Sequence, residues 1–145
     1  MLLMRHAKSR WDEGVSDHDR SLEPRGQQDA WRMGSWLKDE DLAPERIIAS
    51  SARRAQDTAG LVAQACGFQG RIETEERLYR AGVEDLERII ASLDDRRTLL
   101  VGHNPTFEEV VCRRAPDAVP DGKRMPTATV VVLEEPVRWV RPRDL

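Results

Sequence analysis

The sequence lacks the features that mark several broad classes of protein. Its longest apolar runs, such as residues 129–133 (TVVVL), are far shorter than the roughly 20 residues of a transmembrane helix, and its N-terminus does not have the layout of a signal peptide. Its formal net charge of −3 is unlike the basic excess of most nucleic-acid-binding proteins. We therefore expect a cytoplasmic protein that has neither a membrane nor a nucleic acid as its partner.

Cysteine is scarce too, and the two cysteines form no redox or metal-binding motif. Cys66 and Cys112 fall within predicted helices without CxxC spacing, so we expect reduced thiols that fill core space rather than a disulfide. The chain also lacks internal repeats and low-complexity tracts. Its length of 145 residues, with 39% apolar and 34% charged residues, predicts one globular domain over residues 1–145.

Strand-like and helical segments alternate along the chain. Apolar residues at helical spacing predict helices over residues 24–38, 52–66 and 83–93, and a fourth from residue 104 onward. The predicted strands are residues 1–4, 46–49, 98–101 and 127–133, with weaker candidates at 71–73 and 137–140. This alternation predicts an α/β fold, a three-layer α/β/α sandwich around a mostly parallel sheet. The last two strands are joined through residues 134–136 alone, so at least one edge pairing should be antiparallel.

Several residues indicate where helices begin and end. Pro24 suits the first turn of its helix, and Gly67 is a natural stop for the second helix. The fourth helix should open with Asn104 as N-cap and Pro105 at its first position. The connection over residues 10–22 is long for this fold class, and it either lines a site or is a polar surface loop.

Side chains suited to binding an anion follow three of the predicted strands. In a parallel sheet the carboxyl ends of the strands share one edge, so residues distant in sequence can meet there. Taken singly, a strand-end histidine or a helix-start arginine is usually structural, but three such ends are hard to explain by packing alone. They are Arg5 and His6 after the first strand, Ser50, Ser51, Arg53 and Arg54 after the second, and Gly102 and His103 after the strand at 98–101.

The start of the second helix strengthens the prediction of an anion site. Arg53 and Arg54 lie in its first turn, where the helix dipole disfavours cations by roughly 0.3–1 kcal/mol. A bound anion would remove this conflict. The fourth helix begins directly after His103, so its free N–H groups could also face a phosphate.

Three ordered segments of the chain resemble the signature blocks of the histidine phosphatase superfamily. They are residues 3–9 (LMRHAKS), 50–58 (SSARRAQDT) and 101–105 (VGHNP). The resemblance extends to residues 17–22 and 24–26, and it is strongest to the short phosphohistidine phosphatase branch, the SixA type. It implies a phosphoglycerate mutase-like fold.

The resemblance also implies a role for individual residues. His6 matches the nucleophile that becomes phosphorylated, and Arg5, Arg54 and His103 match the groups that surround the transferred phosphoryl. Arg54 is preferred over Arg53 because it directly precedes the AQDT sequence, as the family's arginine does. Ser9 lies where some relatives help to hold phosphate. No metal or other cofactor is implied.

Two departures bear on the activity. Ala7 stands where most of the superfamily has glycine, although alanine is familiar in the short branch. Larger relatives use a carboxylate as general acid, which contributes about 10²–10⁴ in rate, and Glu76 only loosely matches that context. Its role, like that of His18, is left open. A phosphohistidine substrate would depend less on such an acid, because its P–N bond is reactive.

The sequence therefore predicts a metal-independent phosphatase that works through phospho-His6 and removes phosphoryl groups from phosphohistidine on a protein. Such a short chain has no room for large lid insertions, which favours a shallow site for a phosphorylated protein. The alternatives are a phosphomonoesterase or mutase for small phosphate esters and, more remotely, a phosphate-binding module without catalysis. A metal hydrolase built from His6, His18, His103 and Asp17 or Asp19 ranks below them, because no ligand spacing such as HExxH occurs. The oligomeric state is open, with a monomer favoured.

Overall fold

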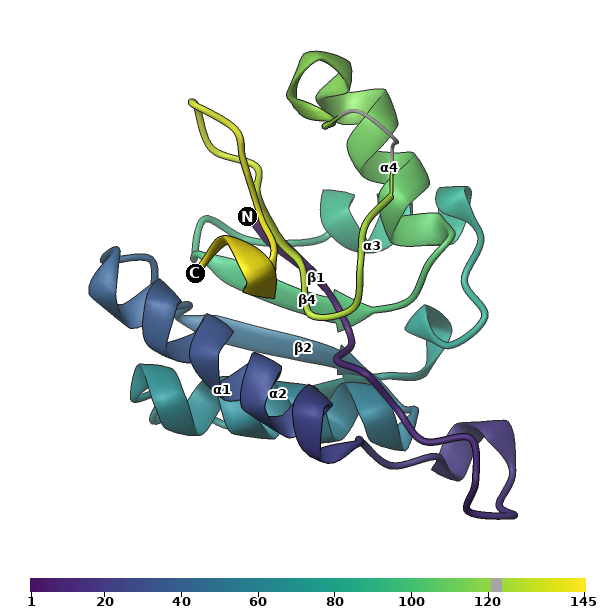
Figure 1. The fold of residues 1–145 in the computed structure, drawn as a ribbon. Coiled ribbons are helices and arrows are strands. Elements are labelled where there is room, and N and C mark those ends of the chain that lie inside the picture. Colours follow the sequence, from purple (N-terminus) through teal and green to yellow (C-terminus); the bar gives the residue numbers. More distant parts are fainter. Residues whose placement is uncertain (121–123) are drawn as a thin grey trace.

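One mixed sheet forms the centre of the molecule. The computed structural model describes residues 1–120 and 124–145, and its sheet has the strand order β3-β2-β4-β1-β5-β6 (Figure 1). The strands are β1 (Leu2–Arg5), β2 (Arg46–Ser50), β3 (Glu73–Glu75), β4 (Thr98–Gly102), β5 (Val130–Val132) and β6 (Arg138–Val140). The central strands β1, β2 and β4 are the predicted apolar runs, and they are buried on both faces.

The pairing of the strands brings three carboxyl ends to one edge of the sheet. β1 pairs with β4, β4 with β2, and β2 with β3, all in parallel. β5 runs antiparallel to both β1 and β6, so the predicted antiparallel edge pairing is confirmed. The ends of β1, β2 and β4 therefore lie side by side, as the sequence predicted for the candidate site.

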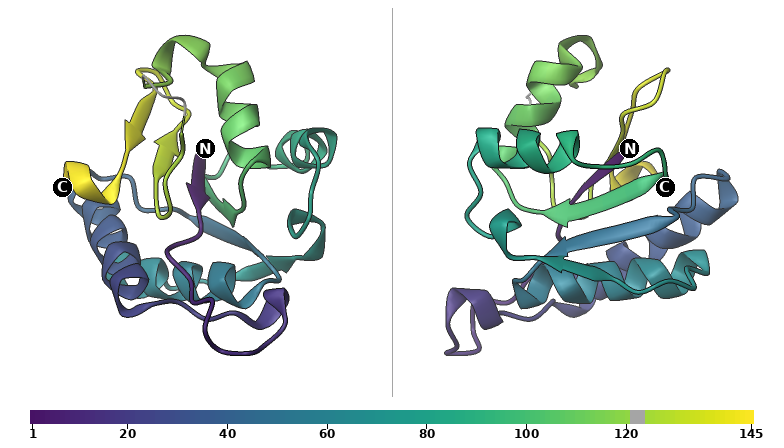
Figure 2. Two further views of the ribbon diagram at one scale, coloured as in Figure 1. Left: turned by 45° about the vertical axis from the view of Figure 1, so that its right-hand side comes forward. Right: turned by 180° about the vertical axis from the view of Figure 1, so that it is seen from behind.

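Helices cover both faces of the sheet. They are α1 (Pro24–Asp39), α2 (Arg53–Cys66), α3 (Val83–Ala91) and α4 (Thr106–Arg114). α1 and α2 lie together on one face, while α3 and α4 lie on the other (Figure 2). Alternate residues of β1 supply the two cores, since Leu2 and Met4 pack with α1 and α2 whereas Leu3 packs with α3 and α4. The predicted three-layer sandwich is confirmed.

Some predicted boundaries shift in the structure. The weak strand candidate at 71–73 is found two residues later as β3. The prediction for the fourth helix was wrong in detail: α4 begins at Thr106 with Pro105 as its N-cap. Asn104 lies one residue further out, yet its Oδ1 still accepts from a backbone N–H of the first turn, that of Glu108 (3.3 Å), while its Nδ2 donates to the carbonyl oxygen of Met125 (2.9 Å). Gly67 ends α2 as predicted, with a positive φ of 78°.

Two further expectations can be compared with the described residues. Cys66 and Cys112 are both free thiols, as expected, and Cys66 is buried at the end of α2. Within residues 1–120 and 124–145, none of the helices has the length and hydrophobicity needed to cross a membrane.

Candidate functional site

Two histidines meet at the shared carboxyl edge of the sheet. His6 directly follows β1, and its backbone N–H donates to the carbonyl oxygen of Gly102 at the end of β4 (2.9 Å). His103 follows β4, and its ring centroid lies 5.2 Å from that of His6. The Nε2 atom of His103 lies 2.8 Å from Oγ of Ser50, the last residue of β2. All three strand ends therefore contribute to one cluster.

His6 is buried and held in one tautomer. The residue is only 7% exposed, and its Nδ1 lies 2.7 Å from the carbonyl oxygen of Ala7. Because a carbonyl can only accept, Nδ1 must carry the proton, and Nε2 keeps its lone pair. The pKa of His6 is lowered to about 3, chiefly by burial and also by the charges of Arg54 and Arg5, against the opposing effect of the Ala7 contact. Arg5, the residue before His6, contributes to this lowering, but burial is the larger cause.

His103 is also neutral near pH 7. Its pKa is lowered to about 4, first by burial and then by the charge of Arg54, while Asp17 acts in the opposite direction. Two neutral imidazoles therefore lie among the cationic side chains of Arg5 and Arg54, an arrangement that suits attack on, and stabilisation of, an anionic group.

The two arginines have buried donors without a protein partner. Arg54 is 6% exposed and donates through Nη1 to the carbonyl oxygen of Asp17 (2.7 Å). Arg5 donates through Nη1 to the carbonyl oxygen of Met125 (3.0 Å). Among the described residues, the Nε–H of each arginine is buried and unpaired. An unsatisfied buried donor costs about 1–3 kcal/mol, so a bound anion would stabilise both.

The structure separates the two neighbouring arginines of α2. Arg54 is buried in the cluster, whereas Arg53 is exposed and forms an ion pair with Asp57 (3.6 Å). This placement agrees with the preference for Arg54. The backbone of the site is tied to α2 by Thr58, which accepts from the Ala7 N–H (2.9 Å) and donates to the carbonyl oxygen of Arg54 (2.7 Å).

The loop over residues 10–22 contacts this site, so it lines the site rather than being only a polar surface loop. Its short 3-10 helix, η1 (Asp17–Asp19), carries a carboxylate that pairs with Arg54 Nη2 (3.2 Å) and accepts from Arg20 Nε (3.2 Å). The same carboxylate accepts from the hydroxyl of Tyr79 (2.7 Å). The Tyr79 hydrogen bond is the main cause that lowers the pKa of Asp17 to about 2. Asp17 is thus an anion that holds Arg54 in place.

All three histidines of the chain and its single tyrosine form a continuous series of rings. From His6 to His103 the centroids are 5.2 Å apart, from His103 to Tyr79 5.7 Å, and from Tyr79 to His18 4.8 Å. His18 Nε2 also lies 3.0 Å from Oγ of Ser51. The sequence reasoning assigned no role to Tyr79, which lies three residues after Glu76.

Ser9 and Glu76 have other surroundings. Ser9 is buried, and its hydroxyl accepts from Nη1 of Arg20 (2.7 Å). Its role in phosphate binding stays a prediction. Glu76 is exposed at the start of a second 3-10 helix, η2 (Glu76–Leu78), and no role as general acid is supported there. Within the residues that the structure describes, histidine, cysteine and carboxylate side chains form no group of three or more that could hold a metal ion.

Comparison with known proteins is consistent with this geometry. The model of the histidine phosphatase superfamily (branch 1) matches residues 1–87. An uncharacterized protein of Mycobacterium leprae, ML1117, is 32% identical over 94% of this chain and 89% of its own length. A structure from Agrobacterium tumefaciens, assigned as phosphohistidine phosphatase SixA, has a TM-score of 0.84 at 30% identity, covering 97% of this chain and 96% of that one.

A second SixA structure extends the likeness of fold. It is the protein histidine phosphatase SixA complexed with tungstate, with a TM-score of 0.78 at 23% identity and coverage of 99% of this chain and 97% of that chain. The matched family model includes β1, α1, β2 and α2, which supply His6 and Arg54. The chain therefore belongs to branch 1 of the histidine phosphatase superfamily and has its phosphoglycerate mutase-like α/β fold.

Proposed function

We propose that this protein is a phosphatase that removes the phosphoryl group from phosphohistidine on a protein, through a covalent intermediate on His6. The observation that carries the proposal is the state of His6, which is neutral, has its Nε2 lone pair free, and lies among the charges of Arg5 and Arg54. A nucleophile must be unprotonated to attack phosphorus, and this environment keeps it so at neutral pH.

The reaction proceeds in two displacements. In the first, Nε2 of His6 bonds to phosphorus while the P–N bond of the substrate breaks, and the electron pair goes to the leaving imidazole. That imidazole departs neutral when its other ring nitrogen carries a proton. In the second, water attacks phosphorus, its proton passes to solvent, and His6 regains its electron pair. Arg5 and Arg54 stabilise the charge on the equatorial oxygens in both steps.

Two observations support phosphohistidine rather than an alkyl phosphate as substrate. Glu76 is exposed, and Asp57, a carboxyl whose pKa is raised by burial, pairs with Arg53 rather than with His6 or His103. Asp17 has its pKa lowered to about 2, so it is ionised and cannot donate a proton at neutral pH. The structural likeness to proteins described as SixA points to the same substrate.

Trapping of the intermediate tests the covalent step. Brief incubation with a ³²P-labelled phosphohistidine peptide, followed by denaturation in base, should leave a label that acid releases. His6→Ala should abolish this label. His18→Ala is the matched control, since it removes another histidine of the same ring series and should still be labelled. A label that survives His6→Ala would overturn the assignment.

A comparison of substrates tests the leaving group. We expect kcat/KM to be higher for a phosphohistidine peptide than for phosphoserine or a sugar phosphate, because Glu76 is exposed and Asp17 is ionised, so neither serves as general acid for an alkoxide. Equal or better activity on the sugar phosphate would favour the small-ester phosphatase instead.

A further inference from the structure

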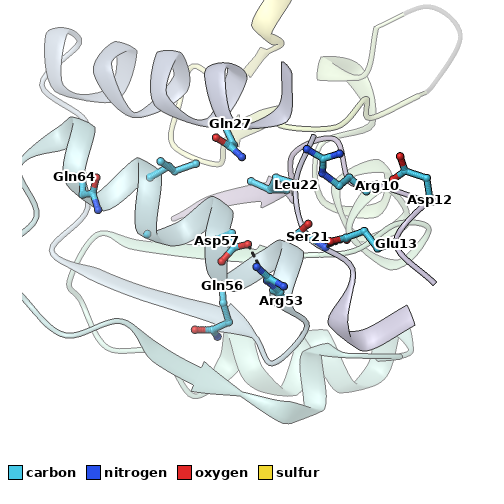
Figure 3. Close-up of a pocket in the computed structure, with 12 residues that line it drawn as sticks. Arg10, Asp12, Glu13, Ser21, Leu22, Gln27, Arg53, Gln56, Asp57 and Gln64 are labelled. Carbon is cyan, nitrogen blue, oxygen red and sulfur yellow. Dashed lines mark hydrogen bonds and ion pairs between the residues drawn. The ribbon is translucent and has the colours of Figure 1, made fainter. Parts of the chain in front are cut away.

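A groove lies beside the candidate site but does not include His6. It has a volume of about 740 Å³ and is formed by α1, α2 and the loop over residues 10–22 (Figure 3). The loop contributes Arg10 and Glu13, α1 contributes Gln27, and α2 contributes Arg53 and Gly60. None of these side chains takes part in the proposed reaction.

The groove is lined with charges of both signs and with free amides. Arg53 pairs with Asp57 within it, as the dashed line in Figure 3 shows (3.6 Å). Glu13 accepts from the Ser21 N–H (2.7 Å), which fixes the loop wall of the groove. Among the described residues, the side-chain amides of Gln27 and Gln64 make no protein hydrogen bond. Such a surface suits the alternating donors and acceptors of a peptide backbone.

Gly60 keeps the groove open without being needed for packing. It lies inside α2, where glycine costs about 0.5–1 kcal/mol relative to alanine. A Cβ atom built there would meet nothing within 4 Å. Gly34 of α1 shows the contrast, because its Cβ would lie 2.8 Å from the carbonyl oxygen of Val62. Glycine at position 60 thus lowers helix stability although packing does not require it. The space beside it is part of the groove.

The groove and the reaction site share two elements, the start of α2 and the loop over residues 10–22. Arg53 and Arg54 are consecutive residues, one in the groove and the other in the His6 cluster. The loop likewise supplies Arg10 to the groove and Asp17 to Arg54. On the loop, Trp11 is 80% exposed and stacks on the guanidinium of Arg20 at 3.6 Å. A large exposed aromatic beside a polar groove is typical of a protein-binding surface.

We propose that this groove binds the extended segment of the substrate protein that flanks its phosphohistidine. This inference rests on the proposed function and identifies the part of the molecule that recognises a protein rather than a free phosphorylated amino acid. The backbone of the bound segment pairs with the amides of Gln27 and Gln64, its polar side chains face Arg53 and Asp57, and its chain passes over Gly60.

Blocking the groove with a side chain at Gly60 tests the inference. The substrates are a pool of short phosphohistidine peptides with randomised flanking residues, and free phosphohistidine. We expect Gly60→Leu to lower kcat/KM about tenfold for the peptides, mainly through KM, and to leave that for free phosphohistidine unchanged. Gln27→Ala combined with Gln64→Ala removes the amides without adding bulk, and should act in the same direction.

Ala91→Leu is the matched control, because it places the same leucine side chain at an exposed helix position on the opposite face of the sheet. It should change neither substrate's kinetics. If Gly60→Leu leaves the peptide kinetics unchanged, or if it lowers both substrates equally, the docking role is overturned. Failure of the proposed function looks different, since the wild-type protein would then hydrolyse neither substrate.

Discussion

The tautomer of His6 depends on one hydrogen bond, from its Nδ1–H to the carbonyl oxygen of the next residue, Ala7. Burial lowers the pKa of His6, so that Nε2 carries no proton at neutral pH. The tautomer of the ring and its neutral charge therefore have separate causes. Asp17 likewise positions Arg54, because its carboxylate, on the loop over residues 10–22, accepts a hydrogen bond from the guanidinium. At the scale of single residues, neighbouring groups therefore set the tautomer of His6 and the position of Arg54.

Tyr79→Phe should raise the pKa of Asp17. The Tyr79 hydroxyl is the main cause of the low value, about 2, so its loss removes the strongest hydrogen bond to the ionised carboxylate. Arg54 and Arg20 remain, and the pKa should rise towards the ordinary value of 3.8 without exceeding it. The carboxyl ¹³C shift of Asp17, followed by NMR over acidic pH, measures this directly. An unchanged titration would show that the two arginines alone set the pKa.

Sequence reasoning identified the residues of this site unevenly. Arg5, His6 and His103 were found because they follow strands, and strand ends of a parallel sheet share an edge. Asp17 and Tyr79 lie 62 positions apart and meet only through the path of two loops, which no periodicity encodes. Their contact with Arg54 could be seen only in three dimensions. The catalytic roles of His6, Arg5, Arg54 and His103 stay predictions.

Among the larger elements, α1 and α2 form the layer that carries both Arg54 and the groove. They pack closely because Gly34 has no side chain, so that the backbone of α1 approaches that of α2 at Val62. The position of α2 in turn sets where Arg54 and Thr58 lie. Packing between these two helices is therefore coupled to the geometry of the site.

Gly34→Ala should destabilise the protein, whereas Gly60→Ala should stabilise it. The new Cβ at Gly34 would lie 2.8 Å from the Val62 carbonyl oxygen, and backbone cannot yield there without moving the helix, at a cost of about 1–3 kcal/mol. The same methyl at Gly60 meets nothing within 4 Å and improves helix propensity by about 0.5–1 kcal/mol. Urea unfolding of the two variants gives the free energies. Similar destabilisation in both would contradict this account of the helix interface.

The sequence predicted the elements better than their ends. Apolar runs at 1–4 and 98–101 and the stripe of α2 are strong signals, since burial on one or both faces leaves a period in the sequence. The start of α4 was placed one residue too early: Asn104 accepts from the Glu108 N–H as a capping residue would, but the helix itself begins only after Pro105. The antiparallel pairing of β5 with β1 also required tertiary information, because all the elements from α1 to α4 lie between these two strands in the chain.

Across the whole molecule, a chain with a net charge of −3 gathers buried cations and two neutral histidines at one edge of its sheet. This arrangement suits the binding of an anion and costs stability when no anion is present. Keeping His6 and His103 neutral is part of that cost, and it makes stability depend on pH.

The free energy of unfolding should fall as the pH falls from about 7 to 4.5. The pKa of His6 is about 3 and that of His103 about 4 in the folded protein, against 6.5 ordinarily, so below pH 6.5 the unfolded chain binds protons that the folded protein does not. Each histidine should contribute a loss of roughly 2 kcal/mol over this range. Asp17, with a pKa of about 2 against 3.8 ordinarily, titrates below this window and would act only at lower pH.

Urea unfolding at several pH values tests this, with His6→Asn as the informative variant. Asparagine cannot titrate, so the variant should lose its share of the slope, roughly half of the contribution of the two histidines, whatever its own stability at pH 7. The slope, not the absolute stability, carries the information, because the substitution also changes packing around a buried ring. An identical slope in the variant would mean that His6 gains its proton equally in the folded and unfolded states. That result would remove the basis for a neutral nucleophile at this position.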